Sequence, residues 1–300
     1  MFASREATSA DVRAMQEVAI QCWRHDRPLA HVHAGDLAWW TRQHGGREGE
    51  WRRGLWTFDG SPVAWAWLSV PDAEGELQVV PPHRERLVAE VAGWLFDRAS
   101  ECGAPAITLN AIDTDQATLR GLSDAGFADG TPSGYHHMLR RMEDPPTVAP
   151  VPEGFAVRHV AGEQDVERRV AVHRAAFSIT RPSRVTVTSY RGAMAEWPYR
   201  AELDWVVEAP DGRFASACLT WLDAQNRVGL LEPVGTDPEF WRLGCARAVC
   251  TAALAALHRC GARTAVVGSV DLPDRPPARL LYESLGFETV ARALRLSRAL

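Results

Sequence analysis

The chain has 300 residues, which is enough for two domains of ordinary size. Hydrophobic residues make up 46% of it and charged residues 24%, as in a globular protein, and a formal net charge of -5 without a long basic run is not that of a nucleic-acid binder. No stretch approaches the ~18 apolar residues that cross a bilayer, and the first residues lack the pattern of a secretion signal. We therefore expect a cytoplasmic protein that binds neither nucleic acid nor membranes.

Strands and helices alternate along the first half of the chain. Asp59-Gly60 stands between two apolar runs and predicts a tight hairpin turn. His31 and His33 have no carboxylate or cysteine ligand at a telling spacing, and the six cysteines form no CxxC pair, so we predict buried, reduced thiols and no metal site. The other elements expected here are a helix after Arg5, a strand over 76–80, a helix over 86–98, a strand over 106–109 and a short helix that ends at Gly126-Phe127.

A proline-rich segment, 143–154, divides the chain nearly in half. Proline breaks helices and pairs poorly in sheets, so we predict a semi-rigid linker between a domain over 1–142 and a domain over 155–300. The second half repeats the order of elements of the first, from a strand that ends in Arg158 to a short helix that ends at Gly286-Phe287. Strands and helices in this order predict an α/β fold with a mixed (α+β) sheet in two related domains.

The strand and helix between residues 228 and 260 form the most informative pattern for function. A strand over 228–236 leads through a short loop into a helix that begins near Gly244 and shows apolar residues at helical spacing. The free N–H groups and the positive dipole end of a helix N-terminus suit a phosphate, and the small residues Gly244 and Ala246 would let one approach closely.

Pro233 interrupts the strand that precedes this helix. Proline cannot donate a ladder hydrogen bond, so we expect a bulge there or a point where two strands part. The exposed backbone of Val234, Gly235 and Thr236 would then be free to pair with an extended amide ligand, as an added strand does.

Two motifs in this half resemble the GNAT superfamily of N-acetyltransferases in its tandem two-domain form. The first reads Trp241-Arg-Leu-Gly-Cys-Ala246, where the family has Arg/Gln-x-x-Gly-x-Gly/Ala. The second reads Arg275-Pro-Pro-Ala-Arg-Leu-Leu-Tyr-Glu-Ser-Leu-Gly-Phe287, where the family has a pattern close to Asn-x-x-Ala-x-x-Leu-Tyr-x-x-x-Gly-Phe. The resemblance covers 155–300 and, more weakly, 1–142. It implies transfer of an acetyl group from acetyl-CoA to a primary amine of a small molecule, by direct attack and without a metal.

The resemblance also implies where acetyl-CoA binds. Trp241 stands where Arg or Gln is usual, so Arg242 or Arg247 would supply the positive charge instead. Arg275 stands where Asn is usual, which exchanges a polar contact near the pantetheine arm for a salt link or removes it. The predicted cofactor-binding residues are Val234, Gly235, Thr236, Arg242, Leu243, Gly244, Cys245, Ala246, Arg247 and Arg275.

Two residues are predicted to be catalytic. Tyr282 fills the position of the motif's tyrosine, which in the family lies near the sulfur, and would protonate the leaving thiolate as a general acid. Glu232 would be the general base, because strand alternation places it on the face of Val234 and a carboxylate in an apolar strand needs a partner or a cavity. The alternatives are a tyrosine that only packs and a glutamate in a salt bridge or facing solvent. Cys245 is expected to be a variable motif residue and not a nucleophile. Four further acidic residues could attract a cationic substrate, although surface placement is expected for each: Glu196, Glu202, Asp204 and Asp223.

The first half lacks these features. Leu122 occupies the place of Tyr282, and the loop after Val80 is about four residues shorter and has no Gly-x-Ala. We therefore predict a degenerate GNAT-like domain with a structural role, and a share in the acceptor pocket or in homodimer contacts stays open. Tryptophans such as Trp39, Trp40, Trp65 and Trp67 could line an acceptor pocket, although core packing is expected for most of them. Two alternatives to the function stay open as well, an acyltransferase that uses another acyl donor and a non-catalytic CoA-binding or scaffold protein.

Overall fold

The structure is a computed structural model of the chain and describes residues 1–43, 45–128, 130–178, 182–270 and 278–300. These residues form two compact units. The first unit comprises Met1–Leu37, Arg47–His137 and Thr289–Leu300, and the second comprises Ala38–Gly46 and Met138–Glu288. Each half of the sequence therefore gives a piece to the unit that the other half mainly forms. Among the helices that the structure describes, none is both long and apolar enough to cross a membrane.

The first unit is built on a mixed sheet. The first four strands pair antiparallel in chain order: β1 (Phe2–Glu6), β2 (Trp51–Phe58), β3 (Ser61–Ser69) and β4 (Glu74–Val79). β4 pairs in parallel with β5 (Ala106–Ile112), and the C-terminal strand β12 (Glu288–Ala299) pairs antiparallel with β5. The unit also contains the first part of β6 (Thr131–Arg141) and the start of α2 (Ala34–Arg42). Its other helices are α1 (Val12–His25), α3 (Arg84–Glu101) and α4 (Gln116–Asp124).

The second unit repeats this order. Its first four strands again pair antiparallel: β7 (Ala156–His159), β8 (Asp204–Glu208), β9 (Phe214–Asp223) and β10 (Val228–Thr236). β10 pairs in parallel with β11 (Thr264–Val270), and the end of β6 lies next to β11. Its helices are α5 (Val166–Phe177), α6 (Val187–Ala195), α7 (Cys245–Arg259) and α8 (Ala278–Ser284). The predicted mixed α/β fold, repeated in tandem, is confirmed.

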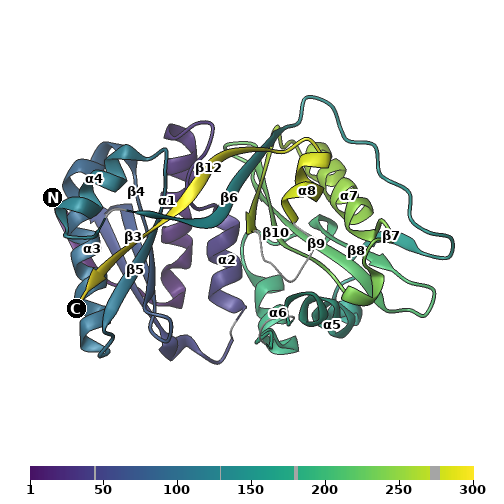
Figure 1. The fold of residues 1–300 in the computed structure, drawn as a ribbon, viewed down its shortest axis with the longest axis horizontal. Coiled ribbons are helices and arrows are strands. Elements are labelled where there is room, and N and C mark those ends of the chain that lie inside the picture. Colours follow the sequence, from purple (N-terminus) through teal and green to yellow (C-terminus); the bar gives the residue numbers. More distant parts are fainter. Residues whose placement is uncertain (44, 129, 179–181, 271–277) are drawn as a thin grey trace. The chain divides into compact units, whose positions relative to one another are not determined.

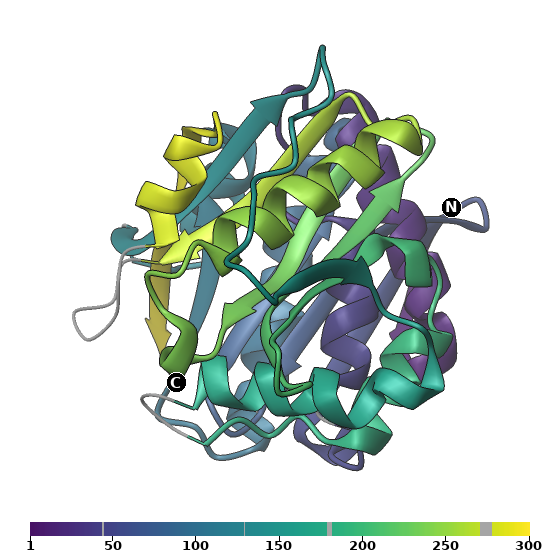
Figure 2. The same ribbon diagram turned by 90° about the vertical axis from the view of Figure 1, so that its right-hand side faces the viewer.

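Helices cover both faces of the sheet in each unit. In the second unit, α7 and α8 lie on one face and α5 and α6 on the other (Figure 1, Figure 2). β9 is buried along its whole length, as expected for a strand between two layers of helices. In the first unit, α1 lies on one face of the strands, and α3 and α4 lie on the opposite face (Figure 1). The sheets are therefore fixed scaffolds, and only their ends and loops remain free to form a site.

The first hairpin turn is the one that the sequence predicts. Asp59 and Gly60 join β2 to β3, and both have positive φ, at 48° and 83°. These values belong to the two-residue turn that matches the twist of paired strands. In the second unit, Asp211-Gly212 instead lies within a longer connection between β8 and β9.

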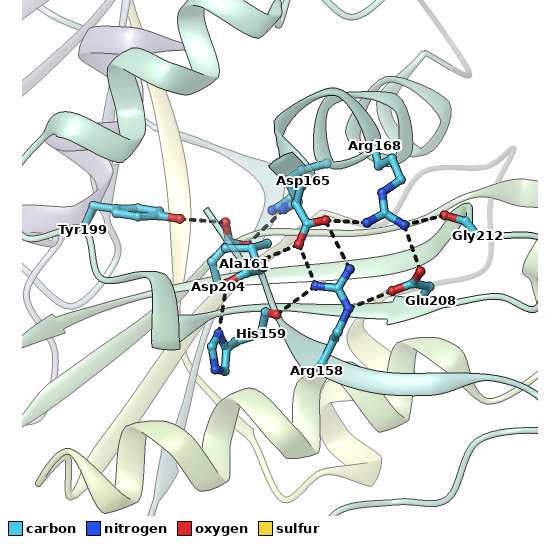
Figure 3. Close-up of polar contacts among 11 residues, drawn as sticks. Arg158, His159, Ala161, Asp165, Arg168, Tyr199, Asp204, Glu208 and Gly212 are labelled. Atoms are coloured by element: carbon cyan, nitrogen blue, oxygen red, sulfur yellow. Dashed lines mark hydrogen bonds and ion pairs between the residues drawn. The ribbon is translucent and has the colours of Figure 1, made fainter. Parts of the chain in front are cut away.

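Both units anchor their first helix with the same ion pair. In the second unit, the guanidinium of Arg158 donates to both carboxylate oxygens of Asp165, across 2.6 and 3.1 Å (Figure 3). Arg168 binds the same carboxylate, and both arginines also bind Glu208 on β8. Asp165 directly precedes α5, so the network ties two strands to the start of that helix. In the first unit, Arg5 makes the equivalent bonds to Asp11, directly before α1. This pair explains why each half begins with an arginine-ended strand and a helix.

Candidate active site

The second unit contains a cavity of about 420 Å³ at the N-terminus of α7. The end of β10 and α8 form two of its sides, and the end of α5 forms a third. Most of the predicted site residues line it, whereas Glu232 and Leu243 are not among the described residues that do. Arg275 lies outside the described residues. The predicted residues that line the cavity are Val234, Gly235, Thr236, Arg242, Gly244, Cys245, Ala246, Arg247 and Tyr282.

β10 parts from β11 at the edge of this cavity. Their parallel pairing runs from Val228 to Leu231, and no further pair between the two strands occurs in the described part of the chain. On the other side of β10, the register with β9 shifts between Leu231 and Val234, so the strand has the bulge expected at Pro233. The indole Nε1 of Trp221 donates to the carbonyl oxygen of Glu232 across 2.6 Å. This bond satisfies a buried carbonyl that the bulge removes from the ladder.

Beyond the bulge, each residue of β10 lies on the opposite face of the sheet from the one that strict alternation predicts. Gly229 and Gly235 are six residues apart and would share a face in an uninterrupted strand. A Cβ on Gly229 would lie 2.6 Å from Leu257 of α7, whereas a Cβ on Gly235 would lie 2.7 Å from Ala176 of α5. The two glycines therefore meet helices on opposite faces of the sheet.

The expectation that Glu232 shares a face with Val234 is consequently wrong. Alternation counted from Leu231, which packs in the core beneath α7, places Glu232 on the α5 face. Val234 follows the bulge, packs against the core beneath α7 and lines the cavity. Strict alternation does not hold across Pro233, because the bulge adds one residue to this strand.

The loop before α7 turns through two left-handed residues. Arg242 has a φ of 66° and Gly244 a φ of 82°. A Cβ on Gly244 would meet no atom within 4 Å, so its backbone conformation, and not a protein neighbour, is what favours glycine there. Gly244 is the residue before α7, and as a glycine it has no side chain to cap this helix end. The N–H groups of the first turn are thus available to an anionic ligand.

Trp241 has a role that the sequence did not reveal. Its Nε1 donates to the carbonyl oxygen of Thr236 across 3.2 Å, and its side chain lines the cavity. The tryptophan therefore joins the end of β10 to the loop that precedes α7. The residue that replaces the usual Arg or Gln of the motif supplies a structural clamp in place of a charge.

Of the two nearby arginines, Arg242 is the free cation. Its side chain is exposed, and no ion pair to it occurs among the described residues. Arg247 instead donates from Nη1 to the hydroxyl of Ser284 across 2.8 Å, which ties α7 to the end of α8. Leu243 is 45% exposed and is not among the described residues that line the cavity.

Tyr282 lies on α8, is 4% exposed and lines the cavity. Its ring centroid lies 5.9 Å from that of Phe287, and its carbonyl oxygen accepts a bond from the Phe287 N–H across 3.0 Å. Gly286 has a φ of 80° and lets the chain turn back for this bond. The Gly-Phe ending thus fixes the helix that carries Tyr282. Cys245, at the other side of the cavity, is 1% exposed, and burial raises the pKa of its thiol, which keeps it neutral and a poor nucleophile.

Two of the acidic residues expected at the surface are in fact buried, so that prediction is wrong for them. Asp204 is 0% exposed and Asp223 is 2% exposed. Asp204 accepts bonds from Nε of Arg169 across 3.0 Å and from the hydroxyl of Tyr199 across 3.3 Å (Figure 3). A buried carboxylate needs such partners, and with them it fixes its neighbours in place. Glu196 and Glu202 form ion pairs with arginines.

Residues 173–287 match the sequence model of the Acetyltransferase (GNAT) family. Mycothiol acetyltransferase from Kineococcus radiotolerans is 30% identical to this chain in an alignment of 242 positions that covers 73% of this chain and 70% of that protein. The chain belongs to the GNAT family of acetyltransferases. It is therefore an enzyme that transfers acyl groups.

Two solved structures extend the GNAT likeness to the whole chain. A GCN5-related N-acetyltransferase from Sphaerobacter thermophilus is 21% identical with a TM-score of 0.62, and the match covers 99% of this chain and 95% of that one. A tandem GNAT protein from the clavulanic acid biosynthesis pathway is 13% identical with a TM-score of 0.65, over 100% of this chain and 98% of that one. Both support the tandem GNAT fold.

Several cavity residues carried no usable signal in the sequence. Ala176 and Phe177 end α5, far from either GNAT motif, and only the packing of that helix on Gly235 brings them to the cavity. A glycine in a strand does indicate a close approach, which is the one clue the sequence offered. The remaining lining residues are Phe240, Ala278, Leu280 and Leu281.

The first GNAT-like unit differs at the corresponding helix start. α3 begins at Arg84, whose guanidinium forms ion pairs with Asp26 and Asp115 and whose Nε donates to the carbonyl of Val79 across 3.1 Å. A cavity of about 240 Å³ remains beside these residues. Two carboxylates already neutralise the cation and would repel a phosphate at this end of the helix.

His31 and His33 bind protein groups. Nε2 of His31 lies 2.8 Å from a carboxylate oxygen of Glu76, which holds the pKa of this imidazole above its usual value despite burial. Nδ1 of His33 accepts a bond from the Gly35 N–H across 3.0 Å. In the described residues, no group of three or more His, Cys, Asp or Glu side chains is arranged to hold a metal ion.

Proposed function

We propose that the chain transfers an acetyl group from acetyl-CoA to a primary amine of a small molecule, by direct attack of the amine. The observation that carries this proposal is the combination, in one cavity, of an uncapped helix start at Gly244, a parted strand edge at Val234–Thr236 and the side chain of Tyr282.

In this proposal the donor lies along β10 and ends at α7. Its pyrophosphate accepts hydrogen bonds from the N–H groups in the first turn of α7, where the dipole of the helix favours negative charge. Arg242 adds a free cation beside that turn. The amide groups of the pantetheine arm pair with the edge of β10 that β11 has left, as an added strand would.

The acetyl group would then react between two proton-transferring side chains. Tyr282 protonates the departing thiolate as a general acid. Glu232 takes the proton of the attacking amine, directly or through water. Its position on the α5 face means that the amine would approach from that side of the sheet. The first unit, with Arg84 held by two carboxylates, would bind no acetyl-CoA.

A screen of small primary amines with acetyl-CoA, followed by detection of the released thiol, tests the proposal. We expect amine-dependent thiol release and an acetylated product of matching mass. Longer acyl-CoA donors form a parallel arm. Faster turnover with one of them would replace acetyl-CoA as the proposed donor, and acetyl-CoA binding without turnover on any amine would contradict the proposed acceptor class.

A further inference from the structure

Phe177, at the end of α5, is a wall of the cavity that lies directly against β10. A Cβ on Gly235 would lie 3.0 Å from Cε2 of Phe177, so the ring touches the strand backbone at that glycine. This is the stretch of β10 along which the pantetheine arm is proposed to pair. A small movement of the ring would therefore change the width of the donor groove.

One face of the Phe177 ring is covered by His173. Their ring centroids lie 4.5 Å apart with planes at 26°, which is a stacked arrangement. The two residues are one helical turn apart on α5, at the spacing that brings side chains together on one face. Phe177 thus contacts both the strand and the imidazole ring.

His173 is supported in turn by a residue from the first half of the sequence. Trp39 lies on the part of α2 that belongs to the second unit, and its ring centroid is 5.4 Å from that of His173. Trp39 is 2% exposed and also lies 6.3 Å from the ring of Tyr190.

Tyr190 gives Trp39 a rigid backing. Its hydroxyl donates a hydrogen bond to the buried carboxylate of Asp204. That carboxylate also accepts a hydrogen bond from Nε of Arg169 across 3.0 Å. The guanidinium of Arg169 lies 5.1 Å from the centroid of the Tyr190 ring. Nη2 of Arg169 has no hydrogen-bond partner among the described residues, but the bonds that Tyr190 and Arg169 make to Asp204 still restrain both side chains.

We propose that Trp39 is a positioning residue, which sets the Phe177 wall of the donor cavity through His173. The inference rests on the proposed function in so far as the cavity binds acetyl-CoA. Removing the indole leaves a void beside His173, and a core relaxes only partly around such a void, so His173 and Phe177 can both shift. The segment that carries Trp39 stays attached through Arg42, whose Nε donates to Glu196 across 2.6 Å.

The test compares Trp39→Leu with Trp65→Leu, which removes another fully buried tryptophan, at 0% exposure on β3 of the first unit. Both variants should lose stability, but only Trp39→Leu should weaken acetyl-CoA binding in calorimetry, by about tenfold, which lies within the coupling between contacting residues. Trp39→Phe should restore most of the affinity. In a Phe177→Ala background, Trp39→Leu should have almost no further effect on affinity.

A ligand-free measurement separates this inference from the proposed function. Amide hydrogen exchange over residues 171–177 should become faster in Trp39→Leu and stay unchanged in Trp65→Leu. If wild-type protein binds no acetyl-CoA, the proposed function fails, and the exchange result alone decides the role of Trp39. Unchanged exchange over 171–177, equal affinity losses in the two leucine variants, or additive effects of Trp39→Leu and Phe177→Ala would each overturn the inference.

Discussion

The indole Nε1 of Trp241 donates a hydrogen bond to the carbonyl oxygen of Thr236 across 3.2 Å. This bond joins the strand along which the donor is proposed to lie to the loop that leads into α7. Trp241→Phe keeps an aromatic ring at this position but removes the indole N–H that donates the bond. We therefore expect acetyl-CoA affinity to fall about three- to tenfold, in line with ~1 kcal/mol for one hydrogen bond. Trp205→Phe removes a similar bond, to the carbonyl of Glu202 across 3.0 Å, and should leave affinity unchanged. Calorimetric titration of both variants measures the difference.

We expect each chain to bind one acetyl-CoA, at the helix start marked by Gly244. A Cβ at this position faces open space, so Gly244→Ala adds mainly the strain of a left-handed residue, ~1–2 kcal/mol. Gly244→Trp fills the space in front of the helix and should abolish binding. Arg86→Trp, at an exposed position of α3, should leave it intact. Titration of wild type should give one site per chain, and two equivalent sites would show that the first unit also binds the donor.

Tyr282→Phe should lower kcat by about ten- to a thousandfold, the range for loss of a general acid, because the phenol hydroxyl is the proton donor. The ring remains, so the contact with Phe287 and the affinity for acetyl-CoA should change little. Steady-state kinetics on an identified amine, with Tyr135→Phe as the control, checks this. Wild-type turnover in Tyr282→Phe would assign the tyrosine a packing role.

Glu232→Gln tests the proposed base on the α5 face. The amide cannot accept a proton, so kcat/KM should fall at neutral pH and the acidic limb of its pH profile should flatten. The bond from the Trp221 indole involves only the backbone carbonyl of residue 232 and not its side chain, so it should persist and keep the bulge. A profile identical to that of wild type would point to water or to another side chain as the base.

Asp165 should make the stability of the protein depend on pH. Burial raises the pKa of this carboxyl, but its bonds to Arg158, to the Ala161 N–H and to Arg168 outweigh that effect and lower it to about 2. Because this folded value lies below the unfolded value of about 3.9, the stabilisation is complete above about pH 4 and is lost as the pH falls towards 2. The effect amounts to roughly 2 kcal/mol.

Urea unfolding of Asp165→Asn and wild type at pH 6 and at pH 2.5 measures this dependence. The difference between the two proteins should be large at pH 6 and should shrink at pH 2.5. Asp211→Asn is the control, because the carboxylate of Asp211 is exposed and pairs with the exposed Arg213, so it should contribute much less. A difference for Asp165→Asn that does not vary with pH would contradict the assignment.

Local signals in the sequence account for much of the donor cavity. A proline inside a strand, a glycine before an apolar helix and a Gly-Phe ending each affect only the nearest residues of the chain. The structural roles of Pro233, Gly244 and Phe287 could therefore be predicted from the sequence. The orientation of Glu232 was missed because the bulge reverses the faces of the strand after Leu231.

Contacts between residues far apart in the sequence could not be predicted from such local signals. Nothing in the composition of 289–300 indicates that it pairs with β5, and nothing near Trp39 indicates that it packs with His173. Such partners are chosen by the whole fold, since pattern and propensity specify an element but not its neighbour.

The pairing of β12 with β5 has a consequence for synthesis. β12 follows all the other described strands in the chain, yet it pairs with β5 in the unit whose other strands are translated first. Until Thr289 and the residues after it leave the ribosome, one edge of β5 exposes unpaired backbone groups, which invite wrong pairing with other chains. The first unit therefore cannot mature during translation in the usual N-to-C order, and a nascent chain stalled before Thr289 should remain sensitive to protease over residues 106–112.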